Sequence, residues 1–317
     1  MRIPFHLAKI GYSLEPLEKD YGGKSYIAVS TKQTAIQMCL ELLGSRMHAV
    51  PCILPITAST EALSGVLRSG AQPLLLDISP ETLHLDEKAL QMALEELPGA
   101  VVVLSGVAGH PLPESLLEAL SDVPTVIDWN IAPRPGGMAE EYRTGTFNVY
   151  DFVYLAGFGA LIECSYERQQ QELRMLRDGE LGHSGGLPND VCDNILCRGM
   201  QRHEEYNRAM EMMKTKLYAD GSDDIILWEA SEEVGPMFLT VPNAQRTVTH
   251  LLSYEVEARL GVFPLHRLDV VKDRYIEVPE YPAAEQISKS VIKLPTNRLV
   301  GTAYHANNIV RWMKEII

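Results

Sequence analysis

Several residues combine a reactive side chain with a position where chemistry is common. Asp128 follows the short apolar run TVI, and His110 lies in a loop after the apolar run AVVVLSG. Polar groups at the ends of buried strands often line ligand sites in α/β proteins. Asp128, His110 and Tyr154 could therefore serve as acid–base groups. A loop-capping acid and a structural or exposed histidine are the simpler interpretation, and the sequence leaves both open.

Ser184 is a second candidate, in Gly182-His183-Ser184-Gly185-Gly186, which fits the G-x-S-x-G pattern of a nucleophilic serine. That pattern needs a buried strand directly before the serine and a helix directly after it. Here the polar segment LRDGEL precedes it. We interpret the segment as a glycine-rich turn, with Ser184 as a candidate pocket residue only. The five cysteines include no C-x-x-C pair, so the sequence predicts no metal site.

The elements that position these residues alternate between apolar strands and amphipathic helices. Strands are expected at 51–55, 73–78, 100–106 and 125–128, and helices at 33–44, 60–69, 85–97 and 113–122. This alternation predicts a three-layer α/β domain with a mostly parallel sheet. Two more strands are expected at 152–157 and 160–163, followed by a helix at 165–178 and a long helix at 188–218.

The last third of the sequence has a different pattern. It predicts strands at 224–228, 237–241, 261–265 and 274–278, with helices at 244–260 and 305–316. Fewer helices alternate with these strands, which indicates a smaller α+β domain. We place the boundary between residues 183 and 222, and assign 1–200 to the large domain and 201–317 to the small one.

Composition limits the classes of partner. The formal net charge of −14 argues against nucleic-acid binding, which needs a basic surface. No apolar run is long enough to span a membrane, and the N-terminal residues lack the apolar core of a secretory signal. The sequence therefore predicts a cytoplasmic protein.

Several phrases occur in the order of a known family. The most similar stretch is LPITASTEALSGVLRSGAQPLLLDISPETLHLDEKAL, and GVFPLHRLD and PAAEQISKSVIKLP follow near the C-terminus. Together they resemble the DegT/DnrJ/StrS-type sugar aminotransferases, which are fold-type I enzymes dependent on pyridoxal 5′-phosphate (PLP). The resemblance implies a three-layer αβα domain with a mostly parallel seven-stranded sheet, plus a small C-terminal domain. It also implies a homodimer that acts on a keto-sugar nucleotide.

The resemblance also assigns positions in a PLP site. Asp128 matches the carboxylate that pairs with the pyridine nitrogen. Thr31, Lys32 and Gln33 match the phosphate-binding turn, and Thr31 could also cap the following helix. Ser59 matches the aromatic residue that stacks on the ring, but serine offers no ring face. Lys32 replaces a glycine; it could bind an anion, although an exposed loop position is more common for lysine.

One residue that the family requires is missing. No lysine lies between Lys88 and Lys214, although the family's Schiff-base lysine should precede Gly159 by a few residues. A Schiff base needs a primary amine, and the neighbouring Tyr150 and Asp151 have none.

These losses predict a degenerate family member with no catalytic residue and no cofactor, or with PLP held only non-covalently. It would act as a ligand-binding or partner protein, with a nucleotide sugar as the implied ligand. Two alternatives remain open. One is a PLP-dependent aminotransferase or dehydratase with a non-covalent cofactor, or with a lysine from elsewhere, such as Lys32 or Lys214. The other is a PLP-independent enzyme that uses Asp128, His110 or Tyr154. Pairing with an active paralogue also remains open.

Overall fold

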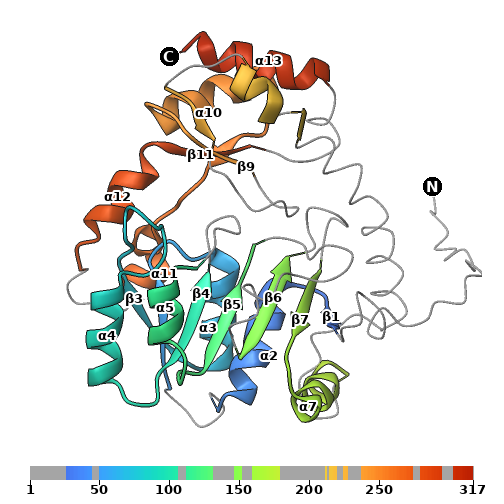
Figure 1. Ribbon diagram of the computed structural model, residues 1–317, viewed down its shortest axis with the longest axis vertical. Coiled ribbons are helices and arrows are strands. Elements are labelled where there is room, and N and C mark those ends of the chain that lie inside the picture. Colours follow the sequence, from blue (N-terminus) through green and yellow to red (C-terminus); the bar gives the residue numbers. More distant parts are fainter. Residues whose placement is uncertain are drawn as a thin grey trace, which may run out of the picture.

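Two β-sheets organise the chain, and the larger lies below the smaller in the view of Figure 1. The computed structural model describes residues 26–44, 50–105, 112–130, 146–151, 159–178, 211–212, 214–219, 224–227, 237–273, 279–294 and 303–316. Strands before residue 164 build the larger sheet, and strands after residue 225 build the smaller one. The predicted boundary between residues 200 and 201 lies outside the described residues and stays a prediction.

The larger sheet has seven strands in the order β1-β7-β6-β5-β4-β2-β3. Only β7 runs antiparallel to its neighbours, β1 and β6, while the remaining pairs are parallel. The predicted mostly parallel, seven-stranded sheet is therefore confirmed. The strands are β1 Tyr26–Val29, β2 Pro51–Pro55, β3 Gln72–Leu76, β4 Val101–Ser105, β5 Thr125–Asp128, β6 Phe147–Asp151 and β7 Ala160–Glu163.

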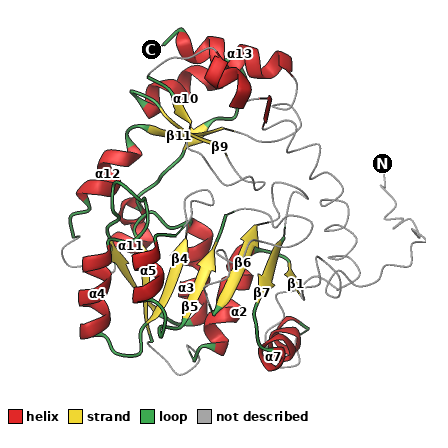
Figure 2. Ribbon diagram, viewed as in Figure 1, coloured by secondary structure: helices red, strands yellow, loops and turns green. Residues whose placement is uncertain are grey.

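Helices cover both faces of this sheet, which gives three layers (Figure 2). One face packs against the first hydrophobic cluster, which includes Ile36, Val66 and Leu173 from three different helices. The other face packs against a second cluster, which includes Leu90 and Leu116. The first group of helices is α2 Lys32–Leu42, α3 Thr60–Ser69 and α7 Glu167–Arg177, and the second is α4 Glu87–Glu96 and α5 Glu114–Ala119.

Gly65 lies where α3 approaches α2 closely. A Cβ atom at Gly65 would lie 2.8 Å from the backbone oxygen of Gln33 and 2.9 Å from Cβ of Ile36. We predict that Gly65→Ala lowers the free energy of unfolding by about 1–3 kcal/mol, since α2 must move away. This cost exceeds the gain in helix propensity of about 1 kcal/mol. Urea denaturation measures it, and exposed Arg68→Ala on the same helix should change stability by less than about 0.5 kcal/mol. Equal losses in the two variants would contradict the packing argument.

The smaller sheet has four antiparallel strands in the order β10-β11-β9-β8. These are β8 Ile226–Leu227, β9 Met237–Thr240, β10 Arg259–Leu260 and β11 Val291–Leu294. Helices α10 Ala244–Ser253 and α13 Ala303–Lys314 pack on the face that carries Leu239 and Ile292. On the opposite face, Phe238 and Val291 join the first cluster of the large domain. Since side chains alternate along a strand, Lys293 shares the face of Val291.

Further contacts join the two parts of the chain. The carboxylate of Asp77 accepts hydrogen bonds of 3.1 Å from the backbone N–H groups of Ala283 and Ala284, at the start of α12. The N–H of Leu265 donates to the carbonyl of Ile56 at 2.8 Å. The C-terminal elements therefore hold the smaller sheet over one edge of the larger one. They are the 3₁₀-helix η3 Leu265–Arg267, α11 Asp269–Lys272 and α12 Pro282–Ser288.

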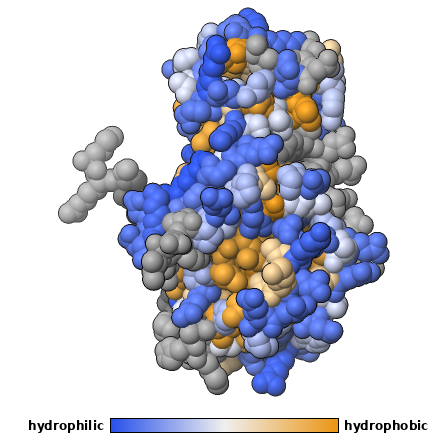
Figure 3. Space-filling model, turned by 90° about the vertical axis from the view of Figure 1, so that its left-hand side faces the viewer, coloured by the Kyte–Doolittle hydropathy of each residue, from blue (hydrophilic) through white to orange (hydrophobic). Residues whose placement is uncertain are grey.

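Polar and apolar side chains are unevenly distributed over the surface. Figure 3 shows polar side chains over most of one face, with a patch of apolar side chains in its lower, large-domain half. Edge strand β3, with partly buried Leu74 and Leu76, and α4, with exposed Met92, belong to this side of the large domain. No helix among the described residues is long and apolar enough to cross a membrane.

Several predicted elements were wrong in extent. The strand expected at 152–157 lies outside the described residues, and β6 at 147–151 directly before it was not predicted. β6 escaped detection because it contains the polar Asn148, which accepts a 3.1 Å hydrogen bond from the Trp129 indole N–H. The helix expected at 244–260 ends at Ser253, because Glu255 adopts a left-handed conformation with φ of 62°. Strands β1 and β11 were not predicted, and most of 188–218 lies outside the described residues.

Candidate ligand site at the carboxyl edge of the large sheet

The carboxyl ends of three neighbouring strands bring polar side chains together. Ser105, Asp128 and Asp151 are the last residues of β4, β5 and β6, which lie side by side in the sheet. The helices that follow β1 and β2 start at the same edge and contribute Lys32 and the N-cap Ser59. Ligands of open α/β sheets bind outside this edge, so topology alone makes this cluster the leading candidate site.

Asp128 is the centre of the cluster and has no exposed surface. Its Oδ2 atom accepts hydrogen bonds from the hydroxyl groups of Ser105, at 2.8 Å, and Ser59, at 3.2 Å. Its Oδ1 atom accepts from the backbone N–H of Asn130 at 3.3 Å. Three donors therefore fix the carboxylate, as buried polar groups require.

Lys32 supplies the positive charge that this carboxylate needs. Its Nζ lies 3.5 Å from Oδ2 of Asp128 and 3.4 Å from Oδ2 of Asp151, and it donates a hydrogen bond to Oδ1 of Asn130. Only 6% of the lysine side chain is exposed. The expectation of an exposed loop lysine was wrong, because Lys32 is the first residue of α2 and points into the cluster.

The pKa values follow from burial and from this ion pair. Burial alone would lower the pKa of Lys32, but the carboxylates of Asp128 and Asp151 raise it to about 12. Burial raises the pKa of Asp128 above its usual value, although Lys32 and the Ser105 hydroxyl oppose that shift. Lys32 is thus firmly protonated, and the cluster is a hydrogen-bonded ion network rather than an apolar hollow.

Asn130 completes the network from a rare backbone conformation. Its φ is 52°, in the left-handed region that asparagine tolerates better than most residues. This geometry places its side-chain oxygen on Lys32 and its side-chain nitrogen 3.3 Å from the hydroxyl oxygen of Ser105. The loop after β5 therefore closes the cluster around Asp128.

A second lysine approaches from the smaller sheet. Lys293 of β11 is half-buried, and its charge interacts with those of Lys32, Asp151 and Glu61. Burial and the Lys32 ammonium lower the pKa of Lys293 to about 8. Both lysines also affect the pKa of Glu61. Burial alone would raise this pKa, but the charges of Lys32 and Lys293 lower it. Two lysines with different pKa shifts therefore face one acidic cluster.

The other predicted site residues have mixed outcomes. Thr31 caps α2: its hydroxyl oxygen accepts from the N–H of Thr34 at 3.2 Å, as expected for a helix cap. Gln33 is half-buried in the first turn of α2. Lys214 forms a 3.0 Å ion pair with Glu211. Three further candidates lie outside the described residues: His110, Tyr154 and Ser184. The described residues include no group of side chains that could hold a metal ion.

Several site residues were missed in the sequence. Ser105 and Asp151 end their strands as Asp128 does, so the strand-end rule that selected Asp128 applied to them too. Lys293 was missed because β11 itself was not predicted. Its signal was a lysine within the apolar run Val291–Leu294, at an inward position of a buried strand.

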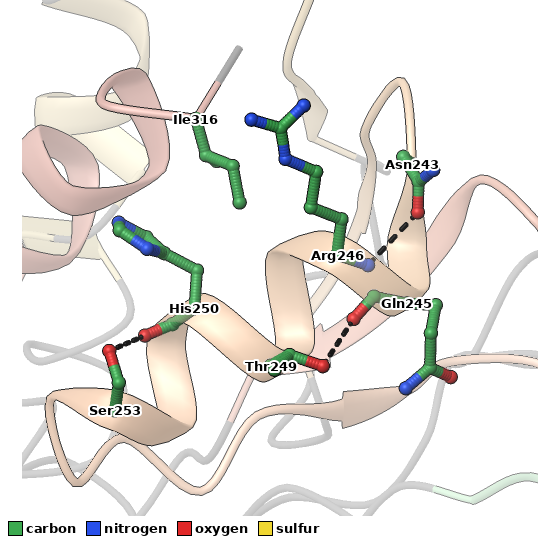
Figure 4. Close-up of a pocket in the computed structure, with 7 residues that line it drawn as sticks. All are labelled: Asn243, Gln245, Arg246, Thr249, His250, Ser253 and Ile316. Carbon is green, nitrogen blue, oxygen red and sulfur yellow. Dashed lines mark hydrogen bonds between the residues drawn. The ribbon is translucent and has the colours of Figure 1, made fainter.

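A hollow of about 610 Å³ lies on the outer side of the small domain (Figure 4). Arg246, His250 and Ile316 border it. The hydroxyl groups of Thr249 and Ser253 donate to backbone carbonyls of their own helix, at 2.9 and 2.6 Å. Its lining includes no carboxylate, so this hollow lacks the convergent charges of both signs found around Asp128.

Known structures share this fold. No protein-family model matches the sequence, and no curated protein matches it. The protein Spr1654 of Streptococcus pneumoniae, a provisional sugar aminotransferase in its PLP form, superposes with a TM-score of 0.76 at 15% identity, covering 92% of this chain and 88% of that one. A DegT DnrJ EryC1 StrS aminotransferase from Brucella abortus gives 0.72 at 15% identity, covering 93% and 86%. 3-Amino-5-hydroxybenzoic acid synthase gives 0.75 at 15% identity, covering 93% and 87%.

The comparison corrects one expectation and confirms another. The prediction of no cofactor is contradicted, because the Spr1654 structures include PLP and PMP forms, so this fold points to PLP. The resemblance inferred from the sequence phrases is confirmed at the level of the fold. The chain has the fold of the DegT/DnrJ/EryC1/StrS-type, PLP-dependent sugar aminotransferases.

Proposed function

We propose that this protein binds PLP at Asp128 and catalyses amino-group chemistry of the aminotransferase type. The observation that carries the proposal is the buried carboxylate of Asp128, fixed by Ser59 and Ser105 at the carboxyl edge of the large sheet. The solved structures of this fold are named as sugar aminotransferases, which makes a keto-sugar the first substrate class to test.

The side chains around Asp128 fit PLP, with one conflict. Asp128 offers a carboxylate to the pyridine nitrogen. The first turn of α2, with Thr31 at its cap, offers N–H groups that have no acceptor within the helix to the phosphate. The conflict is Lys32, whose ammonium already lies 3.5 Å from the Asp128 oxygen that the ring nitrogen needs. The two cations therefore compete for Asp128, while Asp151 remains as a partner for Lys32.

Each residue then has a defined task. Bound PLP with a protonated ring nitrogen acts as an electron sink for bonds broken at the amine carbon of the substrate. Asp128 would hold that proton at the ring nitrogen, and its own hydrogen bonds from Ser59 and Ser105 keep the carboxylate in place. Lys32 and the α2 N-terminus would attract the phosphate by charge and dipole. Ser59 gives no aromatic stacking, so we expect weaker PLP binding than a stacked ring allows.

This proposal predicts a loss of PLP affinity in Asp128→Asn. A hydrogen bond to a charged partner contributes about 1.5–3 kcal/mol, so we expect the dissociation constant of PLP to rise about 10–100-fold. Titration of the purified protein with PLP, followed by visible absorbance and by the shift in melting temperature, measures it.

Asp269→Asn is the matched control, because Asp269 is exposed on α11. It should leave PLP affinity unchanged. Failure of the wild-type protein to bind PLP at millimolar concentration would overturn the proposed function. Equal affinity in wild type and Asp128→Asn would place PLP elsewhere.

A second candidate is a PLP-binding protein without turnover. It is favoured by the ion pair with Lys32, which satisfies Asp128 before any ring arrives. This is the degenerate state expected from the sequence, now with a cofactor. Amino donors separate the two functions: an enzyme converts bound PLP to its amine form, with a change in absorbance, and a non-catalytic protein leaves the spectrum unchanged. A homodimer belongs to both proposals, and sedimentation equilibrium tests it.

A further inference from the structure

We infer that Lys293 supplies the primary amine that binds PLP covalently, in place of the lysine missing from the stretch between Lys88 and Lys214. The inference rests on the proposed function, since it needs PLP at Asp128. Neither the sequence phrases nor the similar structures point to this residue. What points to Lys293 is its position on the face of the smaller sheet that packs against the large domain.

The geometry of β11 directs Lys293 toward the large domain. Ile292 and Leu294 face α10 and α13 in the core of the small domain. Val291 faces the first cluster of the large domain, together with Phe238. Lys293 is two residues from Val291 and opposite Phe238 in the ladder, so it shares that face. A strand, rather than a loop, thus sets the direction of its side chain.

Close packing holds the strand that carries Lys293. Its Nζ lies 6.0 Å from the centre of the Phe238 ring. A Cβ atom at Gly261 would lie 2.6 Å from Val291 and 3.0 Å from Phe238, so β11 packs closely against its neighbours next to Lys293. The amine is therefore presented from a rigid support, as a covalent attachment site requires.

Charge distinguishes Lys293 from Lys32. Lys32 lies between Asp128 and Asp151, and its pKa is raised to about 12, so its nitrogen carries no available lone pair near neutral pH. Lys293 is partly desolvated beside the Lys32 ammonium, and its pKa falls to about 8. The lowered pKa raises the share of Lys293 in its neutral form, which is the nucleophilic one. Lys32 thus keeps its proton and promotes loss of the proton from Lys293.

The covalent step balances without a co-reactant. The lone pair of the neutral Lys293 Nζ attacks the aldehyde carbon of PLP and forms a carbon–nitrogen bond. The two hydrogens of that amine leave with the aldehyde oxygen as one water molecule, and a carbon–nitrogen double bond remains. No oxidation or reduction occurs. Borohydride reduces that double bond to a stable amine that mass spectrometry detects.

The test is reductive trapping with PLP. Wild-type protein is incubated with PLP at pH 8, reduced with borohydride, and mapped by peptide mass spectrometry. We expect one major adduct, on Lys293. Lys293→Arg should lose more than about nine tenths of it, while Lys289→Arg, an exposed lysine at the end of α12, should retain it.

A second measurement uses no cofactor. Trace acetylation of wild-type protein across pH 6–10 should give Lys293 a reactivity midpoint near pH 8. Lys32 should stay unreactive over this range.

The outcomes are distinct. Absence of bound PLP would end the proposed function together with this inference. Bound PLP with its adduct on Lys32, on another lysine, or on none would overturn the inference alone. An acetylation midpoint for Lys293 above pH 10 would also overturn it, because the amine would then be too protonated to react.

Discussion

Lys32→Met is expected to lower the free energy of unfolding by about 3–5 kcal/mol at pH 7, the usual cost of leaving a buried charge unpaired. Lys32 is 6% exposed and lies within 3.5 Å of two carboxylates. Methionine preserves the volume of the stem, so the loss reports the charge rather than a cavity. Urea denaturation followed by circular dichroism measures it.

The pH dependence of this variant gives a second signature. Burial already raises the pKa of Asp128, and Lys32 is its main opposing partner. Without Lys32 the folded-state pKa of Asp128 rises further above its unfolded value. A carboxyl group shifted upward stabilises the fold at low pH, and that stability is lost as the pH rises through the folded-state pKa. The deficit relative to wild type should therefore shrink as the pH falls from 8 toward 4.

Two controls make the result specific. Exposed Lys88→Met on α4 should change stability by less than about 0.5 kcal/mol. The double variant Lys32→Met/Asp128→Asn removes both charges of one pair. Its loss in free energy of unfolding should be about 1–3 kcal/mol smaller than the sum of the losses of the two single variants. Additive losses, or a Lys32→Met protein as stable as wild type, would contradict the ion network.

The architecture could be predicted because it depends on repeated local signals. Apolar strands and amphipathic helices alternate clearly up to Asp128, and the observed strands β2 to β5 match the predicted ones. The signal failed where strands carry polar residues, as in β6 with Asn148 and β11 with Lys293. Those polar groups face partners that are distant in sequence, so a local pattern cannot identify them.

The centre of the site could also be predicted, but its electrostatics could not. Asp128 was selected because it ends a buried strand, and the structure places it at the meeting point of β4, β5 and β6. The position of Lys32 matched a phosphate-binding turn, whereas its ammonium contacts Asp128 and Asp151. The direction of a long side chain depends on the charges around it, and these come from strands about 100 residues away.

Lys293 shows how the site depends on both sheets. The stretch without lysine lies mostly in the large domain, and a replacement was expected there or at its end. The fold brings β11, more than 100 residues later, over the same cluster. A group missing from one segment can be supplied from another when the topology brings the two segments together.

Lys293→Met is expected to raise the free energy of unfolding by about 1–2 kcal/mol at pH 7. The pKa of Lys293 falls from 10.5 to about 8 on folding. A shift of this size corresponds to at most about 3.4 kcal/mol, and partial exposure to solvent reduces it. Folding disfavours the charged form of a lysine whose pKa is lowered. The folded state therefore loses stability as the pH falls from 10.5 through 8 and this lysine becomes protonated. The gain from Lys293→Met should thus be full below pH 8 and vanish above pH 10.5.

Urea denaturation of wild type and variant between pH 6 and pH 11 measures this difference. Lys289→Met is the matched control, since Lys289 is exposed four residues earlier, and its difference from wild type should not depend on pH. A Lys293→Met protein less stable than wild type at pH 7 would mean that this ammonium contributes favourably to folding. A gain in stability would instead mean that the fold retains a destabilising lysine beside Asp151 and Glu61. Retention at such a cost is typical of a residue kept for function, which ties this measurement to the amine proposed for PLP.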